Sequence, residues 1–306
     1  MKPSKTFLAQ VAHEFVEDQC PRLAAAISYY TIFSLPALLV VALAVAGLAV
    51  ERQAVVELLS GEIGKLLGTQ AVDQLQAMID AGLRRPREGN LLGAALGIGA
   101  FLFAATGAFV QIQGALNTVW GVAPSASGLP VRHFLVKRLL SFGMILVVGL
   151  LILLLLGLST LVTLLGDRIG SFVPGSVEPL LSSVGPIGVT WVTATLLFMV
   201  VYRLLPDAEI RWSVTLVGAA VTGALFTLGE QLMGHYLIRF APADAFGAAG
   251  SLALFLFWIY VSAIAFLLGA EITQVWASRR GTPIRPEEGA VKIIVSKETL
   301  DSPTAT

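Results

Sequence analysis

The chain has 306 residues, of which 56% are hydrophobic and 13% are charged, and its mean hydropathy is +0.82. This composition excludes a soluble globular protein, because too few polar residues are present to cover a water-facing surface, and it predicts a membrane protein. Twenty basic residues balance twenty acidic ones, so no global field favours a nucleic acid, and the single cysteine excludes an internal disulfide.

Residues 1–22 precede the first long apolar run and have an amphipathic pattern. Apolar residues between Phe7 and Val16 recur at helical spacing, and charged residues such as Lys5, Glu14 and Asp18 are interspersed with them. These charges exclude a secretory signal peptide. The pattern predicts an N-terminal cytoplasmic segment that forms a short helix on the membrane surface.

Long apolar runs locate the membrane spans, because about 20 apolar residues cross the hydrocarbon core of a bilayer. Six such runs predict an all-α fold, a bundle of six transmembrane helices within a membrane domain of residues 23–277. The runs cover residues 23–50, 91–120, 139–166, 186–205, 212–237 and 245–270.

Two segments outside the spans have patterns of their own. Residues 51–88 place apolar side chains at helical spacing on both sides of Gly68, which predicts two amphipathic extracytoplasmic helices. These helices would cap the bundle, cover a cavity or dock a partner. Residues 278–306 are polar, contain one strand-like run, VKIIVS, and are expected to form a loosely ordered cytoplasmic tail.

The distribution of lysine and arginine predicts the orientation in the membrane. If both ends of the chain are cytoplasmic, most basic residues fall on the cytoplasmic side, as the positive-inside rule requires. Arg84, Arg85 and Arg87, beside the second span, run against this orientation. The remaining connections favour cytoplasmic ends.

The stretch GAFVQIQGALNTVWG, residues 107–121, places amides inside the second span. On a helix, Gln111, Gln113 and Asn117 gather with small residues on one side, and bulky apolar residues lie roughly opposite. Amides in lipid need hydrogen-bond partners from protein or trapped water, so we expect this side to face neighbouring helices or a hydrated cavity. Two roles are consistent with this pattern: the amides connect neighbouring helices, or they line a path for a transported ligand.

Ionisable and polar residues near the ends of the spans are further candidates, because charge is costly to bury in lipid. Glu230, Gln231 and His235 lie late in the fifth span and extend the candidate intramembrane polar site. If Glu230 faces an aqueous cavity, it is a candidate for coupling transport to the movement of a proton or cation. Glu271 closes the sixth span and is predicted to form a structural ion pair with Arg203. For each residue, the alternative is an ordinary interfacial or paired charge.

Small residues at four-residue spacing predict where helices approach closely. Gly93 with Gly97 in the second span, and Gly218 with Thr222 in the fifth, have this spacing. Apolar helices produce the pattern often by chance, so it predicts close packing without predicting a function.

Several short segments together resemble a known family. The chain resembles the YihY/BrkB family of bacterial inner-membrane proteins, once labelled ribonuclease BN, over residues 18–273. The resemblance implies six spans with cytoplasmic ends, and links to envelope integrity, serum resistance and the export of lipids or other envelope components. It implies no catalytic residues. The matching segments are AAAISYYTIFSL (24–35), QGALNTVW (113–120), YRLLP (202–206), HYL (235–237), FGAAGS (246–251), WIY (258–260) and GAEIT (269–273).

The residues do not support the old nuclease label. His13, His133 and His235 lie far apart in sequence without a ligand-rich motif, and no basic, aromatic-interleaved RNA-binding surface is evident. No phosphate-binding glycine loop with its lysine is found either. We therefore expect no ribonuclease activity, no metal site, no cofactor and no nucleic-acid partner.

Three functional hypotheses remain for a protein of the bacterial inner membrane. The first is a transporter, or a protein that translocates lipids or other envelope components, with the polar side of the second span and Glu230 lining the path. The second is a non-catalytic scaffold that binds other envelope proteins through residues 51–88. The third and least favoured is an intramembrane enzyme.

Overall fold

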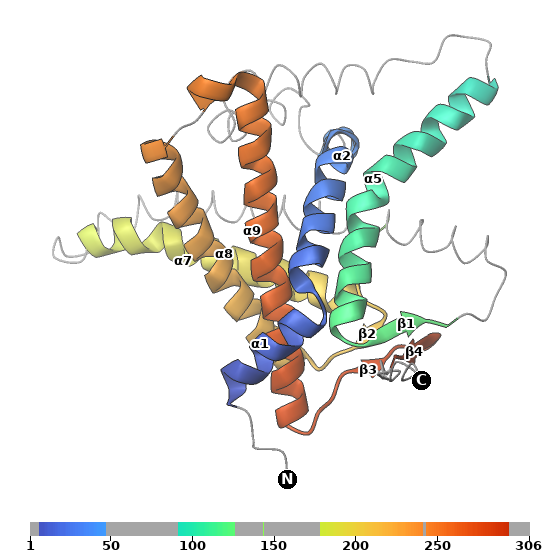
Figure 1. Cartoon of the computed structure of the whole chain (residues 1–306), viewed down its shortest axis with the longest axis vertical. Helices are drawn as coiled ribbons and strands as arrows, with labels where there is room; N and C mark the ends of the chain where they lie inside the picture. The colour runs from blue at the N-terminus through green and yellow to red at the C-terminus, as the bar shows by residue number, and fades with distance from the viewer. Residues whose placement is uncertain (1–5, 47–90, 126–142, 144–177, 241–242, 294–306) are drawn as a thin grey trace, which may run out of the picture.

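The computed structural model describes residues 6–46, 91–125, 143, 178–240 and 243–293. Six long or medium helices carry this part of the chain, and four very short strands lie at one end of it (Figure 1). The helices are α1 (Phe7–Glu17), α2 (Cys20–Ala46), α5 (Leu91–Val119), α7 (Glu178–Leu204), α8 (Trp212–Phe240) and α9 (Ala243–Arg279); the strands are β1 (Val122–Pro124), β2 (Ala208–Glu209), β3 (Arg285–Pro286) and β4 (Ala290–Lys292).

The helices confirm the predicted all-α membrane fold. Five of the six predicted spans are the helices α2, α5, α7, α8 and α9. The third predicted span, at residues 139–166, and the predicted amphipathic segment 51–88 lie outside the described residues. Three described helices contain stretches long and apolar enough to cross a membrane, namely Ile187–Leu204, Trp212–Met233 and Ala253–Arg279.

Helix α9 is the central element of the described bundle and contacts α1, α2, α5 and α8 (Figure 1). It continues to Arg279, beyond the predicted end of the sixth span at residue 270. The extension is helical because its apolar side chains Val275 and Ala277 are buried. Glu271, predicted to close the span, therefore lies inside the helix and is fully buried.

The predicted helix in residues 1–22 is α1, and its buried side faces protein. Val11 is buried, and Phe7 packs edge-on against Trp276 of α9 with ring centroids 6.3 Å apart. Leu8 and Val16 remain exposed on the outer side of α1. Between α1 and α2 the chain turns at Gln19, whose φ of 54° lies in the left-handed region.

Helices α8 and α9 cross at two reciprocal glycine–threonine contacts. A Cβ on Gly218 would overlap Oγ1 of Thr273, and a Cβ on Gly269 would overlap Oγ1 of Thr222. Each threonine hydroxyl also donates to the carbonyl of the glycine one turn earlier in its own helix, at 2.8 Å for Thr222 and 2.7 Å for Thr273. The close approach predicted from Gly218 and Thr222 is confirmed.

The four strands pair at the end of the bundle that also carries α1, which we call the strand end (Figure 1). β1 pairs with β4 and β2 with β3, both antiparallel. Three backbone bonds extend this pairing: Ser125 N to Gly289 O at 2.8 Å, Ile293 N to Gly121 O at 2.7 Å and Glu287 N to Asp207 O at 3.1 Å. The expectation of a loosely ordered tail is therefore wrong for residues 278–293, because their backbone groups pair with segments after α5 and α7; residues 294–306 lie outside the described part.

Candidate functional site

The amides of the second span bind a carboxylate at the strand end. Gln113 Nε2 donates to Asp207 Oδ1 at 3.2 Å, and Asn117 Nδ2 donates to Asp207 Oδ2 at 2.7 Å. The Asp207 backbone N–H donates back to Asn117 Oδ1 at 2.9 Å. Asn117 is buried and Gln113 is half-buried, so both amides face protein as predicted. Their partner lies in the loop after α7, so they connect a helix to a loop.

The described side chains of the predicted intramembrane site do not converge. Gln111 is half-buried on α5, whereas Glu230 and Gln231 are exposed on α8. About 27 Å of helix separate Glu230 from the start of α8 at the strand end, at 1.5 Å per residue. His235 belongs to α8, but its side chain lies outside what the structure describes. The six residues were grouped by polarity alone, which carries no information on depth in the bundle.

The ion pair predicted between Arg203 and Glu271 is not formed. The Arg203 guanidinium donates to the carbonyl oxygen of Ile210 and stacks over Trp212, with its Cζ 5.3 Å from the ring centroid. Glu271 Oε1 accepts a hydrogen bond from the Cys20 thiol at 3.4 Å. The two residues share the strand end but belong to different clusters of side chains.

A pocket of about 490 Å³ opens at the strand end where α7 ends and α8 begins. Three arginines and one glutamate line it, so the charged side chains around it sum to an excess of positive charge. We call it the arginine pocket. Its lining residues are Arg203, Glu209, Ile210, Arg211, Trp212, Gly281, Thr282, Pro283, Ile284 and Arg285.

The arginine pocket depends on the pairing of β2 with β3. Arg203 stands in the last turn of α7, and Arg211 directly precedes α8. Arg285 comes from the segment after α9, and it reaches the pocket because it pairs with Glu209 across the two strands. Sequence reasoning placed Arg203 and Arg211 on one side of the membrane. It placed Arg285 on the same side, but it did not predict that Arg285 would meet the other two, because the only strand signal in that region was the run VKIIVS, which overlaps β4 rather than β3.

Arginine suits the recognition of anions. Its planar guanidinium matches phosphate and carboxylate groups with two parallel hydrogen bonds, and it stays charged at any physiological pH. Arg203 is held by Ile210 and Trp212, whereas Arg211 and Arg285 are exposed at the pocket rim. The pocket therefore combines one fixed and two accessible guanidinium groups.

Comparison with known proteins identifies the family. The family model described as "Virulence factor BrkB" matches residues 11–293 of this chain. The chain belongs to the BrkB family. The match runs from α1 to the residue after β4, so the family covers both the bundle and the strand end.

Curated members of the BrkB family are distant in sequence. A UPF0761 membrane protein of Pseudomonas aeruginosa is 25% identical over 96% of this chain and 70% of its own length. Its counterparts in Azotobacter vinelandii, at 27% identity, and Halorhodospira halophila, at 25%, are covered over 65% and 54% of their lengths. The chain thus spans about half to seven tenths of the relatives it matches. No solved structure matches it significantly.

These findings establish an integral membrane protein of the BrkB family. The relatives are named as membrane proteins, and the apolar helices α7, α8 and α9 agree with those names.

Proposed function

We propose that the protein binds an anionic lipid headgroup, or another anionic envelope component, in the arginine pocket and translocates it across the bacterial inner membrane. The single observation that carries this proposal is the convergence of Arg203, Arg211 and Arg285 around one pocket. No catalytic residue takes part in it.

The position of the arginine pocket supports a lipid as the ligand. One apolar stretch of membrane-spanning length ends at Leu204, beside Arg203, and the next begins at Trp212. The pocket thus lies where two spans reach the membrane boundary, which is the depth of lipid headgroups. Arginine and tryptophan are both typical of that boundary.

The size of the pocket supports a small ligand. Its volume of about 490 Å³ lies within the range of about 300–1,000 Å³ that is typical of small-molecule sites. Glu209 on the rim would repel a second anionic group. A single phosphate-bearing headgroup therefore fits better than a polyanion.

Cytoplasmic ends of the chain are part of this proposal. In that orientation the strand end, with the arginine pocket, faces the inner leaflet, where anionic lipids attract juxtamembrane basic residues. The excess of lysine and arginine on this side of the predicted spans supports the same orientation.

Lipid binding tests the first step of the proposal. The full chain is placed in nanodiscs of zwitterionic lipid, and labelled phosphatidylglycerol is titrated against wild type and the double variant R211Q/R285Q. We expect the double variant to bind more weakly by about a hundredfold or more, because two hydrogen bonds to charged groups are lost and each is worth about 1.5–3 kcal/mol. Arg280→Gln is the matched control, because Arg280 is exposed at the same end but stacks on Trp276, outside the pocket.

Translocation is tested in vesicles that contain the purified protein. Chemical quenching of a fluorescent lipid reports how fast it moves between leaflets. Faster movement with wild type than with R211Q/R285Q supports the proposal. If wild type and R211Q/R285Q bind the lipid equally well, the proposed site is overturned. If wild type binds the lipid tightly but does not move it between leaflets, the scaffold hypothesis is favoured. The docking residues predicted for a scaffold, 51–88, lie outside the described residues.

A further inference from the structure

Glu271 of α9 is a fully buried carboxyl group, and one of its two oxygens has no hydrogen-bond partner among the described residues. Oε1 accepts a hydrogen bond from the thiol of Cys20, the first residue of α2, at 3.4 Å, whereas Oε2 is buried and unpaired. A thiol is a weak donor, so it compensates poorly for the water that a buried carboxylate has lost. The contacts of Glu271 therefore suit a neutral carboxyl group better than a charged one.

The described helices that pack around α9 bring no cation to Glu271. Helix α5 contains no charged residue, and α8 contains none from Trp212 to Gly229. Arg22 is the one basic residue of α2, and its side chain is exposed. A negative charge on Glu271 would thus lie among apolar helices without an opposite charge to compensate for it.

The basic residues that follow Glu271 along the chain are held by other groups. Arg279 donates from Nε and Nη2 to Gln10 Oε1, both at 3.1 Å. Arg280 stacks on Trp276, with its Cζ 4.5 Å from the ring centroid. Both guanidinium groups are exposed, so neither enters the buried surroundings of Glu271.

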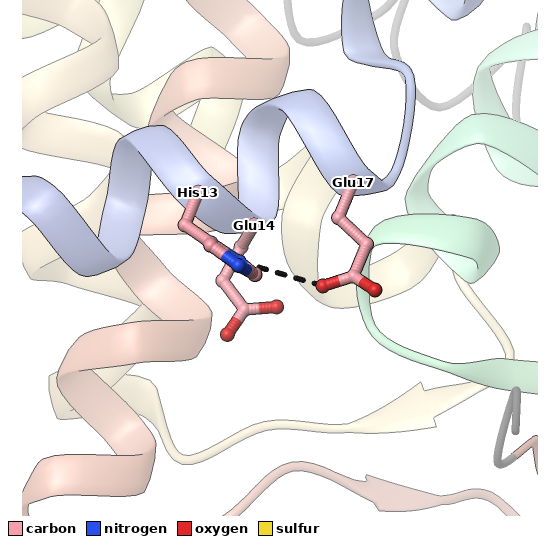
Figure 2. Close-up of side chains that lie close together, drawn as sticks. All are labelled: His13, Glu14 and Glu17. Carbon is pink, nitrogen blue, oxygen red and sulfur yellow. Dashed lines mark ion pairs between the residues drawn. The ribbon is translucent and has the colours of Figure 1, made fainter. Parts of the chain in front are cut away.

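The titratable groups of α1 do not supply a buried cation either. Asp18, directly after α1, and Glu14, one turn earlier, act on Glu271 and are acids. Figure 2 shows Glu14 beside His13 and Glu17, with His13 Nδ1 3.4 Å from Glu17 Oε2. His13 and Glu17 are exposed, so this pair lies on the outer side of α1.

Gln274, one turn after Glu271 on α9, has a second buried acceptor that lacks a donor. Its Oε1 atom is buried and has no hydrogen-bond partner. Residues three positions apart are neighbours on a helix surface, so the two side chains are within reach of each other. A proton on Glu271 Oε2 would turn that oxygen into a donor for Gln274 Oε1. One proton would thus satisfy two buried oxygens and leave the bond from Cys20 in place.

We propose that Glu271 is a proton-binding site, which holds its proton at neutral pH while α2 and α9 are packed together and releases it to water when they separate. Separation would hydrate the carboxyl group, and a hydrated glutamate is ionised at neutral pH. Proton release is thereby tied to a movement of α2 against α9. This site goes beyond the proposed lipid function and does not depend on it. Sequence reasoning assigned proton coupling to Glu230, which is exposed on α8.

Infrared spectroscopy of the full chain in detergent detects the proton, because a protonated carboxyl group has a C=O stretching band that a carboxylate lacks. At pH 7 we expect this band in wild type and its loss in Glu271→Gln, whose amide can still accept the bond from Cys20. Glu287→Gln is the matched control, because it removes an exposed acid at the strand end and should keep the band. Absence of the band from wild type overturns the site, whether or not E271Q folds.

The position of the band tests the contact with Gln274. Gln274→Met keeps the length of the side chain but removes the acceptor. We expect the band to remain and to move to higher frequency, because the carboxyl group has lost its hydrogen bond. An unshifted band in Q274M overturns the contact between Glu271 and Gln274.

The pH dependence of stability tests the same proton by a second route. Between about pH 6 and pH 8 the folded protein would keep the proton and the unfolded chain would lose it, because the ordinary pKa of glutamate is about 4.3. The folded state then binds one proton more, so its stability falls as pH rises. Since E271Q cannot titrate, the ratio of its folding equilibrium constant to that of wild type should rise by up to about tenfold per pH unit.

His13→Asn controls for the histidine of α1, because histidine as a residue type titrates in the same pH range. The ratio of H13N/E271Q to H13N should rise with pH as the ratio of E271Q to wild type does. A ratio that stays constant between pH 6 and pH 8 overturns the site.

Release on separation is tested at Cys20, which is the single cysteine of the chain and is buried. N-ethylmaleimide should label it only when α2 moves away from α9. Higher pH makes any thiol more reactive, so the readout is the ratio of the wild-type rate to the E271Q rate. We expect this ratio to rise by up to about tenfold per pH unit, because ionised Glu271 favours the separated state. A constant ratio overturns the link between proton release and movement.

Discussion

Gly269 of α9 lies so close to Thr222 of α8 that a Cβ on the glycine would overlap the threonine Oγ1 atom. The same hydroxyl is 2.8 Å from the phenolic oxygen of Tyr202, which in turn donates to the Phe266 carbonyl at 2.5 Å. A side chain of α7 thereby reaches the α8–α9 crossing. Helices α7, α8 and α9 are therefore in contact at Gly269, where the absence of a Cβ lets them approach this closely.

Gly269→Ala should therefore destabilise the protein. The new methyl group would overlap Thr222 and lie 2.8 Å from the Tyr202 hydroxyl, and overpacking of this kind costs about 1–3 kcal/mol. Unfolding in mixed detergent micelles, followed by circular dichroism, measures the loss. Gly114→Ala in α5 is the control, because no atom lies within 4 Å of its added Cβ. Equal stability of the two variants would contradict the close crossing.

Tyr202→Phe should cost about 1–2 kcal/mol, because it removes a buried hydroxyl that has two hydrogen-bond partners. The double variant Y202F/G269A should lose less than the sum of the two single losses, because one of the two obstacles to the new methyl group is gone. Unfolding free energies of all four proteins give the interaction energy. Strict additivity would mean that Tyr202 does not confine Gly269.

Asn117→Asp should be more harmful than Asn117→Ala. The substituted carboxylate would replace a donor to Asp207 Oδ2 with a like charge, whereas alanine removes the donor alone. The exchanged pair N117D/D207N should recover part of the stability, because one amide and one carboxylate face each other again. Thermal unfolding compares the three variants. An exchanged pair that is no more stable than N117D would show that the contact contributes little.

Truncation after Gly281 removes β3 and β4 and should loosen the strand end. The Asp207 loop would lose its bond from Glu287, and the arginine pocket would lose Arg285. We expect faster cleavage by trypsin at Arg203 and Arg211, together with weaker binding of anionic lipid. Truncation after Ile293 keeps every described strand and serves as the control. Equal cleavage rates in the two truncated proteins would contradict a supporting role for β3 and β4.

Sequence patterns predicted the helices and the inward direction of some polar residues. Long apolar runs determine where helices cross, so α2, α5, α7, α8 and α9 were predictable. The cost of unpaired amides in lipid predicted that Gln113 and Asn117 face protein. The hydrogen-bond partner Asp207 was not predictable, because it lies in a loop 90 residues from Asn117. Helical periodicity predicts which side of a helix faces protein, but not which residue lies opposite it.

The sequence did not predict the contacts of the strand end or the burial of Glu271, and each failure has a physical reason. Strands of two or three residues are too short for an alternating pattern, so nothing in the sequence indicated that Arg285 would reach Arg211. Glu271 was assigned to the end of a span because charge is expensive in lipid. The structure buries it beside Cys20 of α2 instead, so its environment is set by a protein contact and not by the bilayer.

The strand pairing has a consequence for biosynthesis. A ribosome releases the residues of β1 long before those of β4, and the described helices α7, α8 and α9 emerge between them. Until translation has passed Lys292, the backbone groups of residues 122–124 and of the Asp207 loop must be satisfied by water at the membrane surface. Closure of this side of the molecule is thus a late event, which follows the insertion of the last described helix.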